Sequence, residues 1–420
     1  FNSSIKSIQF PASLEILQEG WCKRTPQLKS INLSQNNKKF SCIDNQILLE
    51  KSDLKNENFD IFSFEARDIK TAVIPSFIKV INASAFSECK QLKTVEFEDK
   101  IELEIIGKNS FHFTSIEKIS IPSSVIKIDK KSFFYCNKLK TVEIPNESRL
   151  CSIGSLAFGA TSIEKFFIPK EVTLIDEKAF NNANSLSSIE FAEHSKLTKI
   201  GDFAFSLTGI KSIRIPSSVV EIGGNSFANC YSLTSVEFEE NSKLDIIRKY
   251  AFSYSPLKAI EIPKSVKTIE EKAFYSCKSL DSFKIDENSE IKTIENYSFY
   301  DTNLRSLFIP SNVTELKDEW CCEIKYLINI SVSKQNKNFI FYDDKFLLGK
   351  TDSKSDKYDI LLFARRDIEC AIIPSFIKKI GCFAFSDCMK LKSIEFSKDS
   401  ELLVIDKSAF SHSSIGRITI

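Results

Sequence analysis

The sequence predicts an α/β-type solenoid, a right-handed superhelix of about 17 short turns with parallel strands and two hairpin inserts. Two observations predict this fold. Phenylalanine occurs 36 times, whereas glycine and proline occur only 11 times each, and the phenylalanines recur at regular intervals. A short apolar motif also repeats along the whole chain. Internal repeats with a period of 20–50 residues are the sequence signature of solenoids, in which stacked turns bury one continuous core.

A phenylalanine preceded by alanine or serine marks each turn. The spacing between successive members alternates between 25 and 22 residues. The members are Phe86, Phe111, Phe133, Phe158, Phe180, Phe205, Phe227, Phe252, Phe274 and Phe299, followed later by Phe385 and Phe410. Each buried aromatic side chain removes roughly 150–250 Å² from water. We therefore expect these rings to stack as a phenylalanine spine inside the solenoid.

The motif L-x-x-I-x-(F/I) follows each phenylalanine and predicts a short strand. It begins at 17 positions, at steps of 23 or 24 residues except for two steps of 41: residues 5, 28, 69, 92, 116, 139, 163, 186, 210, 233, 257, 280, 304, 327, 368, 391 and 415. Apolar residues at the fourth and sixth positions alternate with polar ones, as expected of a strand with one buried face. In alternate turns a proline, such as Pro122, ends the strand because it lacks an N–H donor.

The two long steps predict hairpin inserts near residues 39–67 and 338–366. The inserts and their surroundings match at an offset of 299 residues, for example Trp21 with Trp320 and Arg67 with Arg366. We interpret 1–121 and 300–420 as duplicate modules, and 1–420 as a single continuous solenoid. Each insert contains apolar runs separated by Asp and Asn, which is typical of a hairpin.

The run I-P-S-S-V-x-x-I-x-x-x-x-F-x-x-C-x-x-L-x-x-V, at Ile121 to Ile144 and Ile215 to Phe238, resembles BspA-like leucine-rich-repeat proteins. The alternating 47-residue double repeat, with Ser-Lys-Leu at 195–197 and 242–244, is similar to the members found in parasitic protists. The resemblance covers essentially the whole chain. It implies a leucine-rich-repeat fold and a cell-surface or secreted protein that adheres to host cells, extracellular matrix or other microbes. The family has no motif of catalytic or binding residues to carry over.

The composition argues against several other functions. Basic residues number 57 and acidic residues 56, giving a net charge of +1, so a nucleic-acid partner is not expected. No run of 18 apolar residues is present, so we expect no direct membrane insertion in this segment. Only three histidines occur, His112, His194 and His412, and no nucleophile, phosphate-loop or zinc motif accompanies them. We predict no enzyme, no cofactor and no metal.

Cysteine occurs 12 times, and five cysteines fall three residues after a spine phenylalanine: Cys89, Cys136, Cys230, Cys277 and Cys388. Four of them lie 47 residues or a multiple of 47 apart, which is two turns or more and too far for a disulfide. Ala183 fills the same position in another turn, so a buried column of free thiols is the favoured interpretation. Unpaired cysteines do not indicate an oxidising compartment.

The outward strand positions are the expected binding surface. The second motif position is often lysine and the fifth is often glutamate. A solvated face with weak lateral ion pairs is the favoured interpretation of these charges. Phe167 and Phe308 occupy the fifth motif position in two turns, in place of a polar residue. They are the candidate partner-binding anchors. The alternative for each ring is burial against a neighbouring side chain. Val73 and Ile372 occupy the same position, where we expect the inserts to cover them.

The predicted function is a non-catalytic cell-surface or extracellular binding protein for a protein or glycoprotein ligand on a host or microbial surface. The alternative is a cytoplasmic leucine-rich-repeat scaffold for protein–protein interaction, which the cysteine column favours. Neither end of the sequence carries a polar cap, which an isolated solenoid needs for solubility. We therefore also expect flanking repeats or end-to-end self-association.

Overall fold

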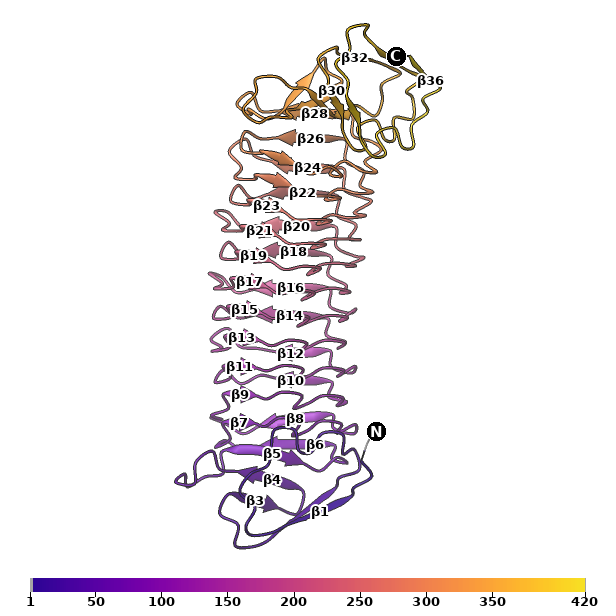
Figure 1. Cartoon of the computed structure of the whole chain (residues 1–420). Coiled ribbons are helices and arrows are strands. Elements are labelled where there is room, and N and C mark those ends of the chain that lie inside the picture. Colours follow the sequence, from indigo (N-terminus) through magenta and orange to yellow (C-terminus); the bar gives the residue numbers. More distant parts are fainter. Residues whose placement is uncertain (1–2, 420) are drawn as a thin grey trace. The chain divides into compact units, whose positions relative to one another are not determined.

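The computed structural model describes residues 3–419 as strands and turns (Figure 1). Residues 1, 2 and 420 of the predicted solenoid lie outside the described residues. The chain divides into two compact units, here called unit 1 (residues 1–210) and unit 2 (residues 211–420). Continuity of the array between the two units stays a prediction. The described residues contain no helix. The solenoid is therefore built of strands and turns, without the helices that the α/β-type class implies.

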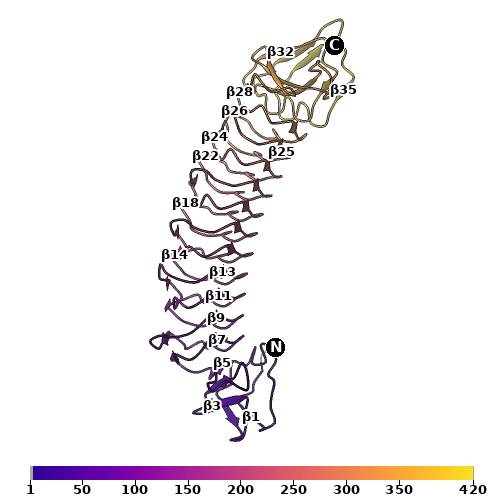
Figure 2. The same cartoon turned by 90° about the vertical axis from the view of Figure 1, so that its left-hand side faces the viewer.

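Most turns of unit 1 contribute one longer strand and one strand of two residues. The longer strands are β1 (Ser7–Phe10), β2 (Ser30–Leu33), β6 (Thr71–Ile74), β8 (Thr94–Phe97), β10 (Lys118–Ser120), β12 (Thr141–Glu143), β14 (Lys165–Ile168) and β16 (Ser188–Phe191). The short strands are β7 (Val80–Ile81), β9 (Ile105–Ile106), β11 (Lys127–Ile128), β13 (Ser152–Ile153), β15 (Leu174–Ile175) and β17 (Lys199–Ile200). Strands of each kind pair in parallel between turns, as the stacks in Figures 1 and 2 show.

Unit 2 repeats this arrangement. Its longer strands are β18 (Ser212–Ile215), β20 (Ser235–Phe238), β22 (Ala259–Ile262), β24 (Ser282–Ile285), β26 (Ser306–Ile309), β28 (Asn329–Val332), β32 (Cys370–Ile373), β34 (Ser393–Phe396) and β36 (Arg417–Thr419). Its short strands are β19 (Glu221–Ile222), β21 (Ile246–Ile247), β23 (Thr268–Ile269), β25 (Thr293–Ile294), β27 (Glu315–Leu316), β33 (Lys379–Ile380) and β35 (Val404–Ile405). The described chain thus has eight longer strands in unit 1 and nine in unit 2, which confirms the 17 predicted motifs.

The phenylalanine spine is confirmed in both units. In unit 1 the rings from Phe62 to Phe205 stack with centroids 4.8–5.5 Å apart. In unit 2 the rings from Phe227 to Phe299 stack at 5.4–6.0 Å. Phe62 was not part of the predicted series. It comes from the insert, so the insert extends the spine of unit 1 by one ring.

Each turn bends sharply around its spine phenylalanine. The residues two before and two after the phenylalanine adopt left-handed backbone conformations, as Asn109 (φ 54°) and Phe113 (φ 57°) do around Phe111. The N–H groups of these three residues donate to carbonyls of the next turn at 2.8–3.1 Å. None of the non-glycine residues with positive φ is Val, Ile or Thr, because β-branched side chains tolerate this conformation least. The left-handed residues therefore orient these N–H groups toward the next turn, so that each corner is hydrogen-bonded although it is neither helix nor strand.

Both predicted hairpin inserts are confirmed. The first consists of the antiparallel strands β3 (Phe40–Ile43), β4 (Ile47–Glu50) and β5 (Ile61–Glu65). The second consists of β29 (Ile340–Tyr342), β30 (Phe346–Gly349) and β31 (Ile360–Ala364). The last strand of each insert then pairs in parallel with a short strand, β5 with β7 and β31 with β33. Each insert therefore extends the short-strand sheet of its own unit.

Residues that match between the two inserts make matching contacts. Asp60 accepts hydrogen bonds from the N–H and hydroxyl of Ser52 at 2.7 and 2.6 Å, and Asp359 accepts the same pair from Thr351 at 2.8 and 2.7 Å. Arg67 is buried, with its guanidinium 4.6 Å from the centre of the Phe64 ring. Arg366 lies in the same way against Phe363. These contacts connect the strands and loop within each insert in the same way.

The cysteine column is buried as predicted. Cys89, Cys136, Cys230, Cys277 and Cys388 are fully inaccessible, and none of the 12 cysteines forms a disulfide. The thiols of Cys136 and Cys277 donate to backbone carbonyls of the preceding turn at 3.0 and 3.1 Å. Burial raises the pKa of each of these two thiols to about 12. The thiols of Cys136 and Cys277 are therefore protonated, and they act as small, weakly donating core groups.

Candidate binding surface

The longer strands form one face of each unit, here called the strand face. Within β14, Phe166 and Ile168 point into the core and are buried, whereas Phe167 between them is half-buried. Within β26, Leu307 and Ile309 are buried and Phe308 is half-buried. Neither candidate ring lies in the core, because successive side chains of a strand point to opposite sides. Both remain part of the surface that a partner can reach.

The surroundings of the two rings are polar. Phe167 lies directly opposite Glu190 in the paired strand β16, and Phe308 lies opposite Ser331 in β28. Phe308 also lines a shallow depression of about 390 Å³ together with Glu261, Lys284 and other residues. A half-exposed aromatic ring among charged side chains is a common arrangement for an interface anchor. The structure brings Phe167 and Phe308 onto strand faces but in different units.

The expectation that the inserts cover Val73 and Ile372 is wrong. Val73 is 51% exposed and Ile372 is 67% exposed, more than is usual for a large apolar side chain. The reason is the direction in which the inserts extend. Their last strands pair with the short strands β7 and β33, so the inserts grow from the short-strand side of the turn. The strand face beside β6 and β32 is left uncovered, which adds one apolar position in each unit.

Acidic depressions lie where the longer strands end. In unit 1 a depression of about 840 Å³ is lined by Glu96, Glu98 and Glu143 among others. In unit 2 one of about 850 Å³ is lined by Glu237, Glu239 and others. Glu143 is held by the Lys118 ammonium at 2.6 Å and by the hydroxyl of Ser120, which lower the pKa of its carboxyl. The strand face of each unit is thus bordered by carboxylates.

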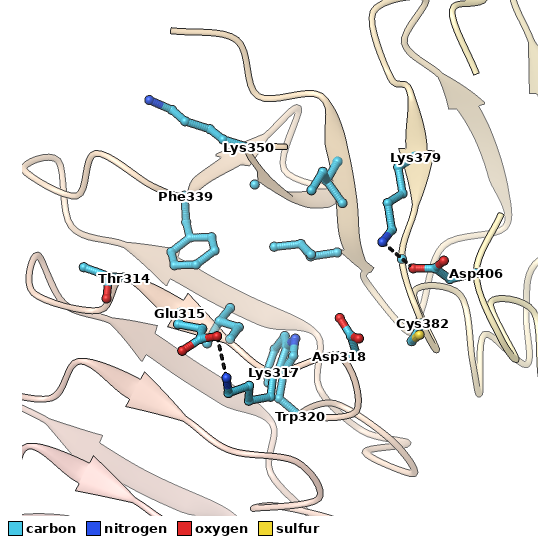
Figure 3. A pocket seen from close by; sticks show the side chains of 15 residues that line it. Thr314, Glu315, Lys317, Asp318, Trp320, Phe339, Lys350, Lys379, Cys382 and Asp406 are labelled. Carbon is cyan, nitrogen blue, oxygen red and sulfur yellow. Dashed lines mark hydrogen bonds and ion pairs between the residues drawn. The ribbon is translucent and has the colours of Figure 1, made fainter. Parts of the chain in front are cut away.

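A smaller cleft of about 200 Å³ lies in unit 2 where the second insert meets β27 (Figure 3). The ring of Trp320 lies on one side, and Lys379 faces Asp406 across 2.8 Å on the other. Cys382 lies at the edge of the cleft, and burial together with Asp406 and Asp318 raises the pKa of its thiol. The charged side chains that pair here already satisfy one another. Its raised pKa keeps the Cys382 thiol protonated, so this thiol is not an activated nucleophile.

Two of the three histidines have defined surroundings. Burial, with Lys131 and Lys23 nearby, lowers the pKa of His112 to about 4, so it is neutral at physiological pH. His412 lies 3.4 Å from the carboxylate of Glu323 at the surface. Within residues 3–419 no group of three or more His, Cys, Asp or Glu side chains is placed to hold a metal ion. The same residues contain no helix of the length and apolarity that a membrane span requires.

Stacked short parallel strands, a phenylalanine spine and a polar strand face together define a leucine-rich-repeat solenoid. The family described as BspA type leucine rich repeat region matches residues 1–54, 57–186, 151–252, 245–345 and 360–420. The chain therefore belongs to the BspA-type leucine-rich-repeat family, as the repeat pattern predicts. Proteins with leucine-rich repeats are generally non-catalytic scaffolds that bind other proteins. No curated protein matches the chain significantly.

Several solved structures are similar to the chain at low sequence identity. A leucine-rich repeat protein from Bacteroides ovatus is 22% identical with a TM-score of 0.50, and the match covers 82% of this chain and 87% of that one. The pneumococcal vaccine antigen PcpA is 18% identical with a TM-score of 0.45, covering 91% and 98%. A leucine rich cell surface protein from Faecalibacterium prausnitzii is 19% identical with a TM-score of 0.39, covering 94% and 88%. At these identities the likeness concerns the fold alone.

Proposed function

We propose that this chain is a non-catalytic binding protein of the cell surface or extracellular space, and that it adheres to a protein or glycoprotein ligand through its strand faces. The observation that carries the proposal is the exposure of large apolar side chains at the fifth motif position. Glutamate is the commonest residue at this position. In four turns it is replaced by an apolar residue: Val73 and Ile372 are more than half exposed, and Phe167 and Phe308 are half-buried. Exposed apolar side chains within a polar rim are typical of protein interfaces.

Two further observations support a surface role. The chain has the repeat of the BspA-type leucine-rich-repeat family, and a leucine rich cell surface protein from Faecalibacterium prausnitzii is among the solved structures to which it is similar. The strand faces also suit binding because they are built from backbone that is fixed by its neighbours on both sides. A rigid scaffold lowers the entropic cost of holding side chains in place for a ligand.

The second candidate is an intracellular scaffold for protein–protein interaction. The observation that favours it is the set of 12 free cysteines, because thiols persist where the compartment is reducing. Antibody staining of intact and permeabilised source cells separates the two proposals. Staining of intact cells supports the surface role. Staining that requires permeabilisation contradicts the surface role and directs the search to cytoplasmic partners.

Point variants test the use of the strand faces. Phe167→Thr and Phe308→Thr keep a β-forming residue at each position and remove the ring. We expect each to weaken binding of the purified chain to host-cell or matrix preparations by at least tenfold, the effect of a modest hot spot. Glu190→Thr, at the same motif position opposite Phe167, is the matched control. Equal binding by the control and by both phenylalanine variants would exclude these rings as anchors.

A further inference from the structure

A basic pocket lies in unit 1 beside the turn corners and is separate from the strand-face anchors. Its volume is about 380 Å³, which lies within the range of small-ligand sites. Four cationic side chains line it, those of Lys23, Arg24, Lys90 and Lys131, together with a single carboxylate, that of Glu88. The residues that line the pocket come from four segments, 23–24, 88–90, 109–113 and 131, that the stacking of turns brings together. No single stretch of sequence contains the pocket.

The cations of this basic pocket are not neutralised by the protein. Within residues 3–419 none of the four forms an ion pair, whereas lysines elsewhere in unit 1, such as Lys118 and Lys196, do so at 2.6–2.7 Å. The Lys131 ammonium lies over the ring of Phe134, 5.5 Å from its centre. Lys131 and Lys23 are also close enough to disfavour a charge on His112. The pocket thus has an uncompensated positive potential.

The side chain of Asn109 offers an amide to a ligand in the pocket. Asn109 lines the pocket, is only 6% exposed, and is fixed in the left-handed conformation. Its backbone N–H and carbonyl are bonded, but its side-chain amide has no hydrogen-bond partner among the described residues. A ligand oxygen beside the cations would complete the bonding of this amide.

An apolar surface adjoins the cations. The ring of Phe113 is 43% exposed, lines the pocket, and lies parallel to the ring of Tyr135 with 4.9 Å between centroids and 8° between planes. The C–H face of a pyranose ring packs well on such an aromatic face, and its substituents then point sideways. The pocket therefore offers an acidic sugar cations for its charged group and an aromatic face for its ring.

The duplicate positions in unit 2 show that the fold does not require these side chains. At the offset of 299 residues, Arg24, Lys90 and Phe113 are replaced by Glu323, Met389 and His412. In contrast, the buried Arg67 is retained as Arg366, with the same kind of contacts. Residues needed for folding are thus the same in both copies, whereas the pocket residues differ and even reverse in charge. A ligand specific to unit 1 accounts for the difference.

We propose that the basic pocket binds an acidic saccharide, with a sulfate or carboxylate group held by Lys23, Arg24, Lys90 and the Asn109 amide and the sugar ring packed on Phe113. Single-stranded nucleic acid fits less well. Such ligands need a basic groove that follows their backbone past several aromatic residues. Here the cations are confined to one pocket, and the depression at the strand ends of the same unit is acidic. The proposed strand-face function does not depend on this site.

The test is calorimetric titration of the purified full chain with a fully sulfated heparin disaccharide at low ionic strength. Two variants probe the site without disturbing the fold. Asn109→Gly removes the amide and suits the positive φ, and Phe113→Asn removes the ring and tolerates the same conformation. We expect Asn109→Gly and Lys90→Glu each to weaken binding about tenfold or more, since hydrogen bonds to charged groups are worth at least that factor. We expect a loss of about tenfold for Phe113→Asn, because it removes the apolar surface on which the sugar ring packs. Lys140→Glu, at an exposed lysine of the strand face, is the matched control and should bind as the parent chain does.

Each outcome decides the proposal. Saturable binding that falls with added salt and is lost in the three pocket variants but not in the control supports it. Absence of binding at millimolar disaccharide, or binding that the pocket variants leave unchanged, overturns it. Inorganic sulfate that binds as tightly as the disaccharide would show a plain anion site, and a thymidine oligonucleotide that binds more tightly would show a nucleic-acid site. Either result overturns the assignment to a saccharide. The unsulfated disaccharide separates recognition of carboxylate from recognition of sulfate.

Discussion

Replacing Arg67 by methionine tests whether a buried cation without a charged partner stabilises the first insert. The guanidinium donates to the carbonyls of Ala85 at 2.6 Å, Ser84 at 3.1 Å and Cys22 at 3.2 Å, and to that of Glu65 at 3.3 Å. These carbonyls belong to the insert, to the corner of the next turn and to the turn before the insert. Arg67 therefore connects three segments that are far apart in the sequence.

The magnitude follows from what remains after the change. Three of the four carbonyls keep another donor: Ala85 the N–H of Glu65, Ser84 the N–H of Ser87, and Cys22 the hydroxyl of Thr25. Methionine fills most of the space and leaves no carbonyl fully unpaired in those three cases. Four charge-assisted bonds at about 1.5 kcal/mol each would be lost, while roughly 3 kcal/mol of desolvation cost would be recovered. We expect Arg67→Met to lower the free energy of unfolding by about 3 kcal/mol.

The two tryptophans allow each insert to be observed separately. The Trp21 ring lies 5.7 Å from that of Phe64 in the first insert, and the Trp320 ring lies 5.9 Å from that of Phe363 in the second. Urea titration of single-tryptophan chains, made with Trp320→Phe or Trp21→Phe, reports one insert at a time. Arg67→Met should shift the Trp21 transition by about 1–2 M urea and leave the Trp320 transition in place.

The matched variant is Arg366→Met, because Arg366 makes equivalent contacts in the second insert. It should shift the Trp320 transition by a similar amount. An unchanged or higher midpoint of the Trp21 transition in Arg67→Met would refute the reasoning. That result would mean that the cost of burying the guanidinium exceeds the worth of its bonds, as occurs for some buried ion pairs.

Three further changes have definite expected outcomes. Burial raises the pKa of the Glu65 carboxyl to about 8, because the folded chain accommodates the neutral carboxyl better than the charged one. The stability that depends on the neutral carboxyl is complete below pH 4.5 and is lost as pH rises through about 8. Glu65→Ala, which introduces the residue found at the matching Ala364, should raise the free energy of unfolding at pH 9 by roughly 3–5 kcal/mol and flatten its pH dependence between 5 and 9 in urea titrations. Ala160 has φ 53°, so in urea titrations Ala160→Gly should stabilise the chain by about 0.5 kcal/mol and Ala160→Val should destabilise it by about 1–2 kcal/mol; the opposite order would contradict the left-handed corner. In the folded chain Cys136 should resist a thiol reagent that labels the exposed Cys370 within minutes, and rapid labelling of both would show that the column opens.

Much of the fold could be predicted from the sequence because the repeat constrains every turn in the same way. The spacing of Phe111, Phe133 and Phe158 predicts a stacked spine, since rings separated by one turn have no other means of leaving water together. The burial of Cys136 could be predicted from its fixed distance to Phe133. Extra residues between regular motifs predicted the inserts, because a solenoid accommodates added residues only outside its turns.

The candidate surface was predicted only in part. The sequence places Phe167 and Phe308 at an outward strand position, which the structure confirms. Exposure of Val73 was not predicted, because it depends on the side from which the insert leaves the turn. The basic pocket was missed altogether, since its residues are spread over 23–131 and follow no period. The offset between the two modules was the one available signal, as it pairs Arg24 with Glu323.

The sequence by itself determined the period, the spine, the cysteine column and the two inserts, because each of these repeats at a fixed separation along the chain. The tertiary structure decided the left-handed corners, the connections made by Arg67, the exposure of Val73 and Ile372, and the convergence of Lys23, Lys90 and Asn109 on one pocket. These features depend on contacts between turns, and residues in successive turns come close only when the turns stack. A repeat pattern specifies what all turns share, and function resides where individual turns differ.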